Sequence, residues 1–426
     1  MISTRSASGN QHSGIFIWPI ASSLVILLLL GPCAVTCSAQ TSVEGFQNTL
    51  SAQAGLTADD WSALERGAVV VRLLPAADKR EVRVYGLTRV QGTPDVVVKA
   101  FQESMVQQKN ESLLSKGRFS NPPSLGDVET LSLEPSDIED LKTCVVGKCE
   151  LKMSAAMIER FQREMNWDSL DYESQANHLH REMLIDYVRD YQTRGDAALI
   201  EYYDQRRAVL VRDEQRILFE RMLYVHDFAP EFANYLKRFP SLELPGVESH
   251  ISWTKINFGF KPVIIVTHVV TYQPPHSRQV LTVSKQLYAN HYLDSSLTMT
   301  AVISTPTSTG DDYYLLYTNY SRSDSLTGSL SRLRRGLVET ESVENLNALL
   351  QQTRANIDVA ATNQSGSNSS VRTYPISEWL FQGARVYAWL LVFLMVVVLI
   401  LLSRRHNDRA HVRASSVKVN HKGDVS

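Results

Sequence analysis

The sequence has few cysteines and almost no net charge. Only 4 of its 426 residues are cysteine, which excludes the class of small, disulfide-dense secreted domains. The 43 basic and 45 acidic residues leave a net charge of −2, without the basic excess that nucleic-acid phosphates demand, so no nucleic-acid partner is predicted. A Gly-rich phosphate loop, a Gly-x-Ser-x-Gly turn and a His-Glu-x-x-His zinc motif are all missing from the sequence. The sequence therefore predicts no cofactor, metal or catalytic residues, and an enzyme is the less favoured class.

An apolar segment near the start of the chain predicts export. Residues 15–30 carry no charge, Arg5 precedes them, and the small residues at 37–39 form a signal-peptidase site. We expect a signal peptide at 1–39, cleaved after Ala39. The alternative is an uncleaved N-terminal anchor, which Trp18 and the long polar start favour.

A second apolar segment near the end predicts a membrane anchor. Residues 386–402 carry no charge and would span about 26 Å as a helix. Trp379 and Trp389 suit the outer interface of a bilayer, and Arg404 and Arg405 end the apolar run. We expect a flexible linker at 353–378, a transmembrane helix at 379–403 and a basic cytoplasmic tail at 404–426. The positive-inside rule then places the preceding domain outside the cytoplasm, in a single-pass membrane protein.

Charge and cysteine placement agree with this topology. The exported part, 40–385, holds 36 basic and 43 acidic residues, a net charge of about −7, so we expect it not to bind polyanions. Once the leader is removed, only Cys144 and Cys149 remain, with four residues between them. In an oxidising compartment this pair predicts one disulfide that closes a tight turn at Gly147.

The exported part has the pattern of an α+β domain with a helical insertion. In the first part, 40–135, Thr57 and Asp60 resemble a capping box, Pro94 opens a helix, and strands are expected at 68–74, 81–91 and 128–133. A mostly helical insertion is expected at 136–245. In 246–352, five runs rich in β-branched and aromatic residues predict an antiparallel meander, at 251–260, 263–272, 279–292, 297–305 and 313–321, followed by a terminal helix at 324–350.

This order of elements resembles the START-like, or helix-grip, superfamily. The most similar stretch runs from 67–71 (GAVVV) through 84–94 (VYGLTRVQGTP) to Phe101, and the resemblance covers about 60–110 and 250–350. It implies an antiparallel sheet wrapped around a long C-terminal helix, enclosing an apolar cavity for lipids or other hydrophobic ligands. The segments 141–149 (LKTCVVGKC) and 317–324 (YTNYSRSD) are also similar to an exported bacterial family of unassigned function.

Strand alternation selects four candidate ligand-binding residues. It places His268 on the face of Ile264, Val266, Val270 and Tyr272, and it places Lys285 and His291 on the face of Leu281, Val283, Leu287 and Ala289. If these faces line the cavity, His268, Lys285 and His291 would orient a ligand carboxylate or phosphate, and Tyr317 would stack on the ligand. The alternative is structural: satisfied histidines, a lysine that reaches water and a tyrosine that only packs.

Two functions follow as expectations. The first is a membrane-anchored module that binds a hydrophobic small molecule or lipid between the sheet and the terminal helix. The second is a structural or interaction protein whose helical insertion docks a protein partner, which predicts an exposed apolar patch on those helices.

Overall fold

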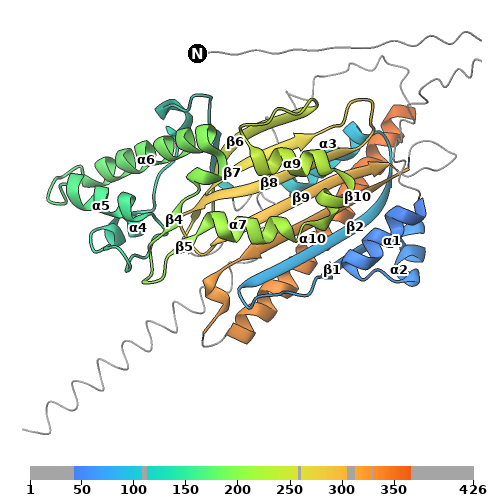
Figure 1. The fold of residues 1–426 in the computed structure, drawn as a ribbon, viewed down its shortest axis with the longest axis horizontal. Helices are drawn as coiled ribbons and strands as arrows, with labels where there is room; N and C mark the ends of the chain where they lie inside the picture. Colours follow the sequence, from blue (N-terminus) through green and yellow to red (C-terminus); the bar gives the residue numbers. More distant parts are fainter. Residues whose placement is uncertain (1–42, 108–112, 258–260, 305–311, 329–330, 366–426) are drawn as a thin grey trace, which may run out of the picture. The chain divides into compact units, whose positions relative to one another are not determined.

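An eight-stranded antiparallel sheet organises the protein, with the strand order β1-β2-β10-β9-β8-β7-β6-β3 (Figure 1). The computed structural model describes residues 43–107, 113–257, 261–304, 312–328 and 331–365, which lie in one compact unit. The strands of the sheet are β1 (Val69–Leu73), β2 (Glu81–Gln91), β3 (Leu113–Arg118), β6 (Val247–Ile256), β7 (Val263–Tyr272), β8 (Val280–Ala289), β9 (Ser295–Ser304) and β10 (Asp312–Arg322). A separate two-stranded ribbon joins β4 (Glu201–Tyr202) and β5 (Val209–Leu210).

The predicted α+β class with a large antiparallel sheet is confirmed. Each of the five predicted runs overlaps a strand, and β6 to β10 pair as consecutive neighbours, as a meander requires. Two local predictions also hold. Thr57 and Asp60 form a capping box at the start of α2, and Pro94 is the first residue of α3, where its missing N–H costs nothing.

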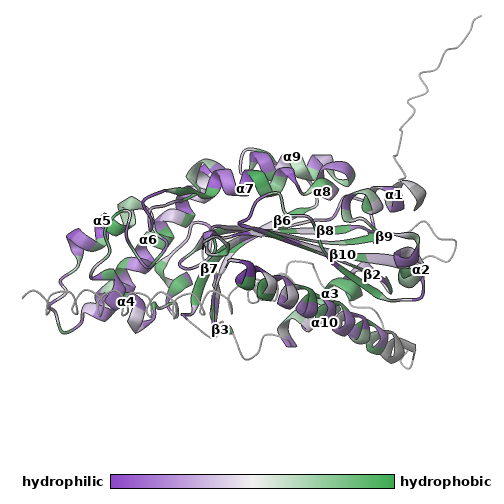
Figure 2. Cartoon of the chain, turned by 90° about the horizontal axis from the view of Figure 1, so that it is seen from below, coloured by the Kyte–Doolittle hydropathy of each residue, from purple (hydrophilic) through white to green (hydrophobic). Residues whose placement is uncertain are grey.

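Helices cover both faces of the sheet (Figure 2). In β10, Leu315 and Tyr317 pack with α3 and α10, whereas Leu316 and Tyr320 point the other way and belong to a core with α1 and α7 to α9. Strand β10 therefore has two buried sides. These helices are α1 (Val43–Ala54), α2 (Ala58–Glu65), α3 (Pro94–Gln107), α7 (Val211–Glu220), α8 (Leu223–Phe228), α9 (Pro230–Arg238) and α10 (Ser331–Ser365).

The last helix, α10, lies very close to strand β2. A Cβ atom at Gly86 would lie 2.7 Å from Leu350 Cδ1 and 2.8 Å from Leu346 Cδ2. Both leucines are fully buried. Glycine at this position is therefore what allows α10 to approach the strand.

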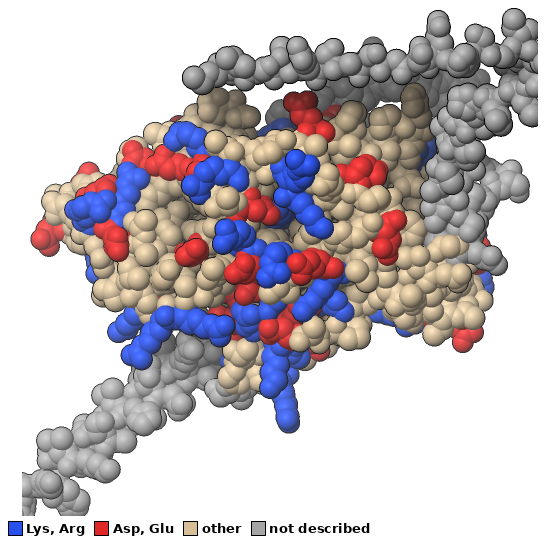
Figure 3. All heavy atoms as spheres, viewed as in Figure 1, with Lys and Arg blue, Asp and Glu red and all other residues tan. Residues whose placement is uncertain are grey.

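A group of helices packs at the β6–β7 end of the sheet. It comprises α4 (Pro135–Leu141), α5 (Ala155–Glu164) and α6 (Tyr172–Arg194), and its core includes Trp253 of β6 and Val266 of β7. The predicted disulfide between Cys144 and Cys149 is present and follows α4 directly. Around these helices basic and acidic side chains are interspersed (Figure 3), in pairs such as Arg160 with Glu164.

The structure corrects two boundaries. The predicted strand at 128–133 is wrong: a 3₁₀ turn, Leu125–Val128, ends there, and Val128, Leu131 and Leu133 are buried in the core of the helical group instead of pairing in a ladder. The terminal helix ends at Ser365 rather than at Leu350, so the first part of the predicted linker is helical.

No helix within the described residues combines the length and the apolar composition that crossing a bilayer requires. The predicted signal peptide, transmembrane helix and cytoplasmic tail lie outside the described residues.

Candidate functional site

His268 faces the helical group rather than α10. Its neighbours on β7, Ile264 and Val266, lie in the same core as α6. The Tyr191 hydroxyl and His268 Nδ1 are hydrogen-bonded at 2.9 Å, and the ring of Phe239 lies 4.4 Å from the imidazole, centroid to centroid. Burial, with a smaller contribution from the charge of Lys285, holds the pKa of His268 well below its usual value, so the ring is neutral at pH 7.

Lys285 lies beside His268 on the neighbouring strand, β8. Its Nζ donates hydrogen bonds to both carboxylate oxygens of Asp196, at 2.7 and 3.0 Å, and the residue is only 6% exposed. This lysine charge is therefore already neutralised by a carboxylate of the 3₁₀ turn Gly195–Ala198, which follows α6.

A β-bulge separates His291 from these two residues. The register of β7 and β8 shifts between Val266 and Thr267, so that Leu287 and Tyr288 contribute to one core while Ala289 packs on the opposite face. The expectation that Ala289 shares a face with Leu287 is wrong, because the extra residue reverses the alternation. His291 lies beyond the end of β8, with its Nε2 3.1 Å from each carboxylate oxygen of Asp137.

Tyr317 lies on the sheet face that α10 covers. It is fully buried in the core formed with α3 and α10, and its ring centroid lies 6.2 Å from that of Phe101. The four candidate residues therefore occupy three places: His268 and Lys285 beneath the helical group, His291 against Asp137, and Tyr317 beneath α10.

Five polar side chains that strand alternation did not select share the α10 side of the sheet. On β7, Thr267 lies between Ile265 and Val269, which point to the same face and cluster with Val338 of α10. Thr267 pairs with Ser252 of β6 on one side and with Gln286 of β8 on the other. We call this set the polar patch; its members are His250, Ser252, Thr254, Thr267 and Gln286.

The polar patch is buried, and its side chains lack hydrogen-bond partners among the described residues. His250 is 6% exposed and the other four residues are at most 1% exposed. In the part of the chain that the structure describes, both ring nitrogens of His250, the three hydroxyl oxygens and both amide atoms of Gln286 have no hydrogen-bond partner. Leaving a buried polar group unsatisfied costs about 1–3 kcal/mol, so a cluster of them points to a hydrogen-bonding ligand or ordered water.

The surroundings of the polar patch are mixed. Burial, followed by the charge of Arg118, lowers the pKa of His250 to about 4, so the patch is uncharged at pH 7. Apolar residues border it, among them Ile265 and Val269. On the same face, the side chains of Thr298 and Thr300 are only half-buried although β9 is an interior strand.

Neither a protein-family model nor a curated protein matches this chain. Within the described ranges, no group of three or more His, Cys, Asp and Glu side chains is placed to hold a metal ion. The site is thus defined by neutral hydrogen-bonding groups bordered by apolar ones, an arrangement suited to binding and orienting a ligand.

Proposed function

We propose that this protein is a single-pass, membrane-anchored extracytoplasmic protein of helix-grip architecture that binds an amphipathic, lipid-like molecule between α10 and the polar patch. The sequence supports the anchor and the export, and the position of the long α10 over one face of an antiparallel sheet supports the architecture. The disulfide between Cys144 and Cys149 is compatible with an oxidising compartment.

The observation that carries the proposal is the buried polar patch on the α10 side of the sheet, whose side chains have no hydrogen-bond partner among the described residues. Gln286 offers a donor and an acceptor, and Ser252 and Thr267 flank it with hydroxyls in adjacent strands. An uncharged polar head, such as a hydroxyl, ester or amide, would satisfy these groups, and an apolar body would contact the neighbouring Ile265 and Val269. This refines the expectation of a purely hydrophobic ligand.

Native mass spectrometry of the full chain, purified in detergent, tests the proposal. We expect a bound small molecule in the parent protein and at least a fivefold lower occupancy in Gln286→Leu and Thr267→Val. Tyr191→Phe is the matched control, because it removes one buried hydroxyl from the opposite face of the sheet and should keep the ligand.

Two results would contradict the proposal. One is a parent protein without any bound small molecule. The other is a Thr267→Val variant that is more stable than the parent with unchanged occupancy, because removing an unsatisfied hydroxyl from a dry core is stabilising.

A protein-docking role through the helical group is the second candidate function. A groove of about 490 Å³ between α5 and α6 favours it, with Met157, Met183 and Ile200 among its lining residues. This function predicts that a second polypeptide is bound to the protein in the native mass spectrum. The bound polypeptide should be lost in the Met183→Lys variant and kept in the Gln286→Leu variant.

A further inference from the structure

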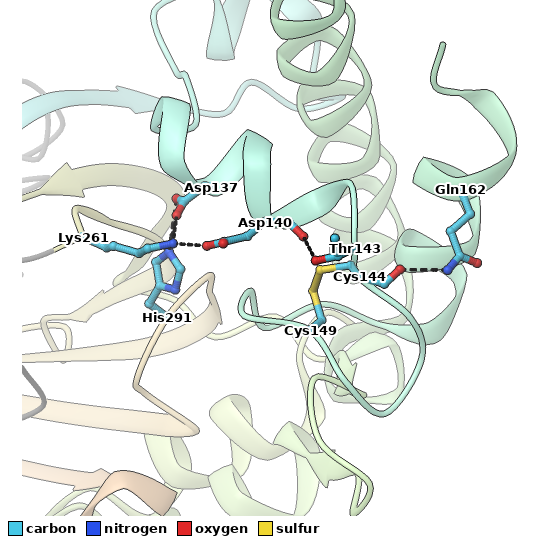
Figure 4. Close-up of a disulfide and its surroundings, with 8 residues drawn as sticks. All are labelled: Asp137, Asp140, Thr143, Cys144, Cys149, Gln162, Lys261 and His291. Carbon is cyan, nitrogen blue, oxygen red and sulfur yellow. Dashed lines mark hydrogen bonds and ion pairs between the residues drawn. A yellow bond between two sulfur atoms is a disulfide. The ribbon is translucent and has the colours of Figure 1, made fainter. Parts of the chain in front are cut away.

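A charged cleft of about 750 Å³ lies next to the disulfide. Its walls come from the Cys144–Cys149 turn, the loop between β4 and β5, the turn after β8 and the start of α10. Figure 4 shows the disulfide turn beside the cluster of Asp137, Lys261 and His291. The cleft is separate from the polar patch, with which it shares no lining residue.

Most of the charges in the cleft neutralise one another. Lys152 Nζ lies 2.8 Å from Asp294 and 3.6 Å from Asp204. Lys261 pairs with Asp137 at 3.0 Å and also with Asp140. Burial raises the pKa of Asp137, but the hydrogen bonds and charges of His291 and Lys261 outweigh burial and lower it overall, so this carboxylate is ionised. Each of these two lysines faces two carboxylates, so neither has a positive charge available to a ligand.

Three cations of the cleft have no such partner. Lys148, Arg206 and Arg207 are exposed lining residues, and among the described residues their side chains form no ion pair or hydrogen bond. Of the acidic lining residues only Glu150 is likewise unpaired, since Asp324 is held by Arg80 at 3.4 Å. Lys152, Lys261 and Arg334 also line the cleft, which makes six basic lining residues against four acidic ones, Asp140, Glu150, Asp204 and Asp324. The lining therefore has an excess of two positive charges.

The backbone holds these cations close together. Gly147 N–H donates to Tyr203 C=O at 2.7 Å, and Cys149 N–H donates to Asp204 C=O at 2.9 Å, which attaches the disulfide turn to the loop that carries Arg206. A Cβ atom at Gly147 would lie 3.7 Å from Arg206 Cα. The disulfide and these two hydrogen bonds thus preorganise the site before any ligand binds.

We infer that this cleft binds a phosphate group through Lys148, Arg206 and Arg207. Guanidinium groups match phosphate oxygens with paired hydrogen bonds, and a lysine adds a flexible point charge. The overall acidity of the exported part does not oppose this, because a small ligand senses the local excess more than distant, screened charges. Val145 and Val146, 47% and 42% exposed on the same turn, would suit the glycerol region of a phospholipid as well as a free phosphate ester.

Calorimetric titration of the full chain in detergent tests the site with three probes: inorganic phosphate, dihexanoyl phosphatidic acid and dihexanoyl phosphatidylcholine. We expect phosphatidic acid to bind and phosphatidylcholine, whose choline neutralises the phosphate, to bind at least tenfold more weakly. Binding of inorganic phosphate as well would identify the free group as sufficient, whereas binding of the phosphatidic acid alone would assign the site to a lipid headgroup.

The double variant Arg206→Ala/Arg207→Ala is expected to weaken binding at least tenfold. It should fold, because both side chains are exposed and unpaired. The matched control, Arg163→Ala/Arg216→Ala, removes the same charge from residues outside the cleft and should bind like the parent. The inference is overturned if neither phosphate nor phosphatidic acid binds at millimolar concentration, or if both double variants lose affinity equally. Gln286→Leu should leave this binding unchanged, so the two sites can fail independently.

Discussion

Replacing Gly86 by alanine should destabilise the protein by displacing α10 from the sheet. The added methyl group would lie 2.7 Å from Leu350 Cδ1 and 2.8 Å from Leu346 Cδ2, and both leucines are fully buried, so neither side chain has free space to enter. Overpacking a core costs about 1–3 kcal/mol. Replacing a strand glycine recovers about 0.5–1 kcal/mol of backbone entropy. From the middle of both ranges, the expected net loss is about 1 kcal/mol.

Urea unfolding of the full chain in detergent, followed by tryptophan fluorescence, measures this loss as a lower midpoint with an unchanged slope. Gly336→Ala is the control within α10 itself, because a Cβ atom there meets no other atom within 4 Å. It should stabilise the helix by about 0.5–1 kcal/mol. The reasoning is refuted if Gly86→Ala is as stable as the parent, or if both alanine variants shift the midpoint in the same direction.

Two further predictions concern the disulfide and a buried histidine. Cys144→Ser/Cys149→Ser should lower the free energy of unfolding by about 2 kcal/mol, the value for a short closed loop. It should also weaken phosphate binding, because Lys148 loses its position. Thermal unfolding with and without reductant checks the loss of stability, and a parent protein insensitive to reductant would contradict it. Burial lowers the pKa of His180 from 6.5 to about 4 in the folded protein. As the pH drops from 6.5 to 4, this histidine is protonated in the unfolded chain but not in the folded one, so the free energy of unfolding falls by about 3 kcal/mol. His180→Leu should remove that decrease in urea unfolding measured across this range. His178→Leu, whose side chain is 60% exposed in the parent, should retain it, and equal pH profiles for the two variants would disprove the assignment.

Local features of the fold are readable from the sequence because their causes are local. The capping box of Thr57 and Asp60 and the helix start at Pro94 depend on residues a few positions apart. The same holds for the short disulfide loop of Cys144 and Cys149 and for the five strands of the meander, whose β-branched and aromatic runs favour extended backbone wherever they pack.

The site residues depend on contacts between distant segments. Alternation divides each strand into two faces, but it does not tell which face α10 covers, because both faces of these strands are buried. Alternation therefore selected His268 and Lys285, which lie beneath the helical group. A bulge at Leu287, which no local pattern marks, then exchanged the two faces of β8 for the residues that follow it. The alternating His250, Ser252 and Thr254 in a buried strand were the available signal for the polar patch.

The sequence by itself determined the α+β class, the five strands of the meander, two helix starts and the pairing of two cysteines. Only the tertiary structure decided that Thr267 faces the α10 side of the sheet, that His291 meets Asp137 across 154 positions, and that Gly147 adjoins Arg206. The physical reason is that backbone preference and periodicity act within a few residues, whereas burial and charge pairing arise when the sheet brings remote segments into contact.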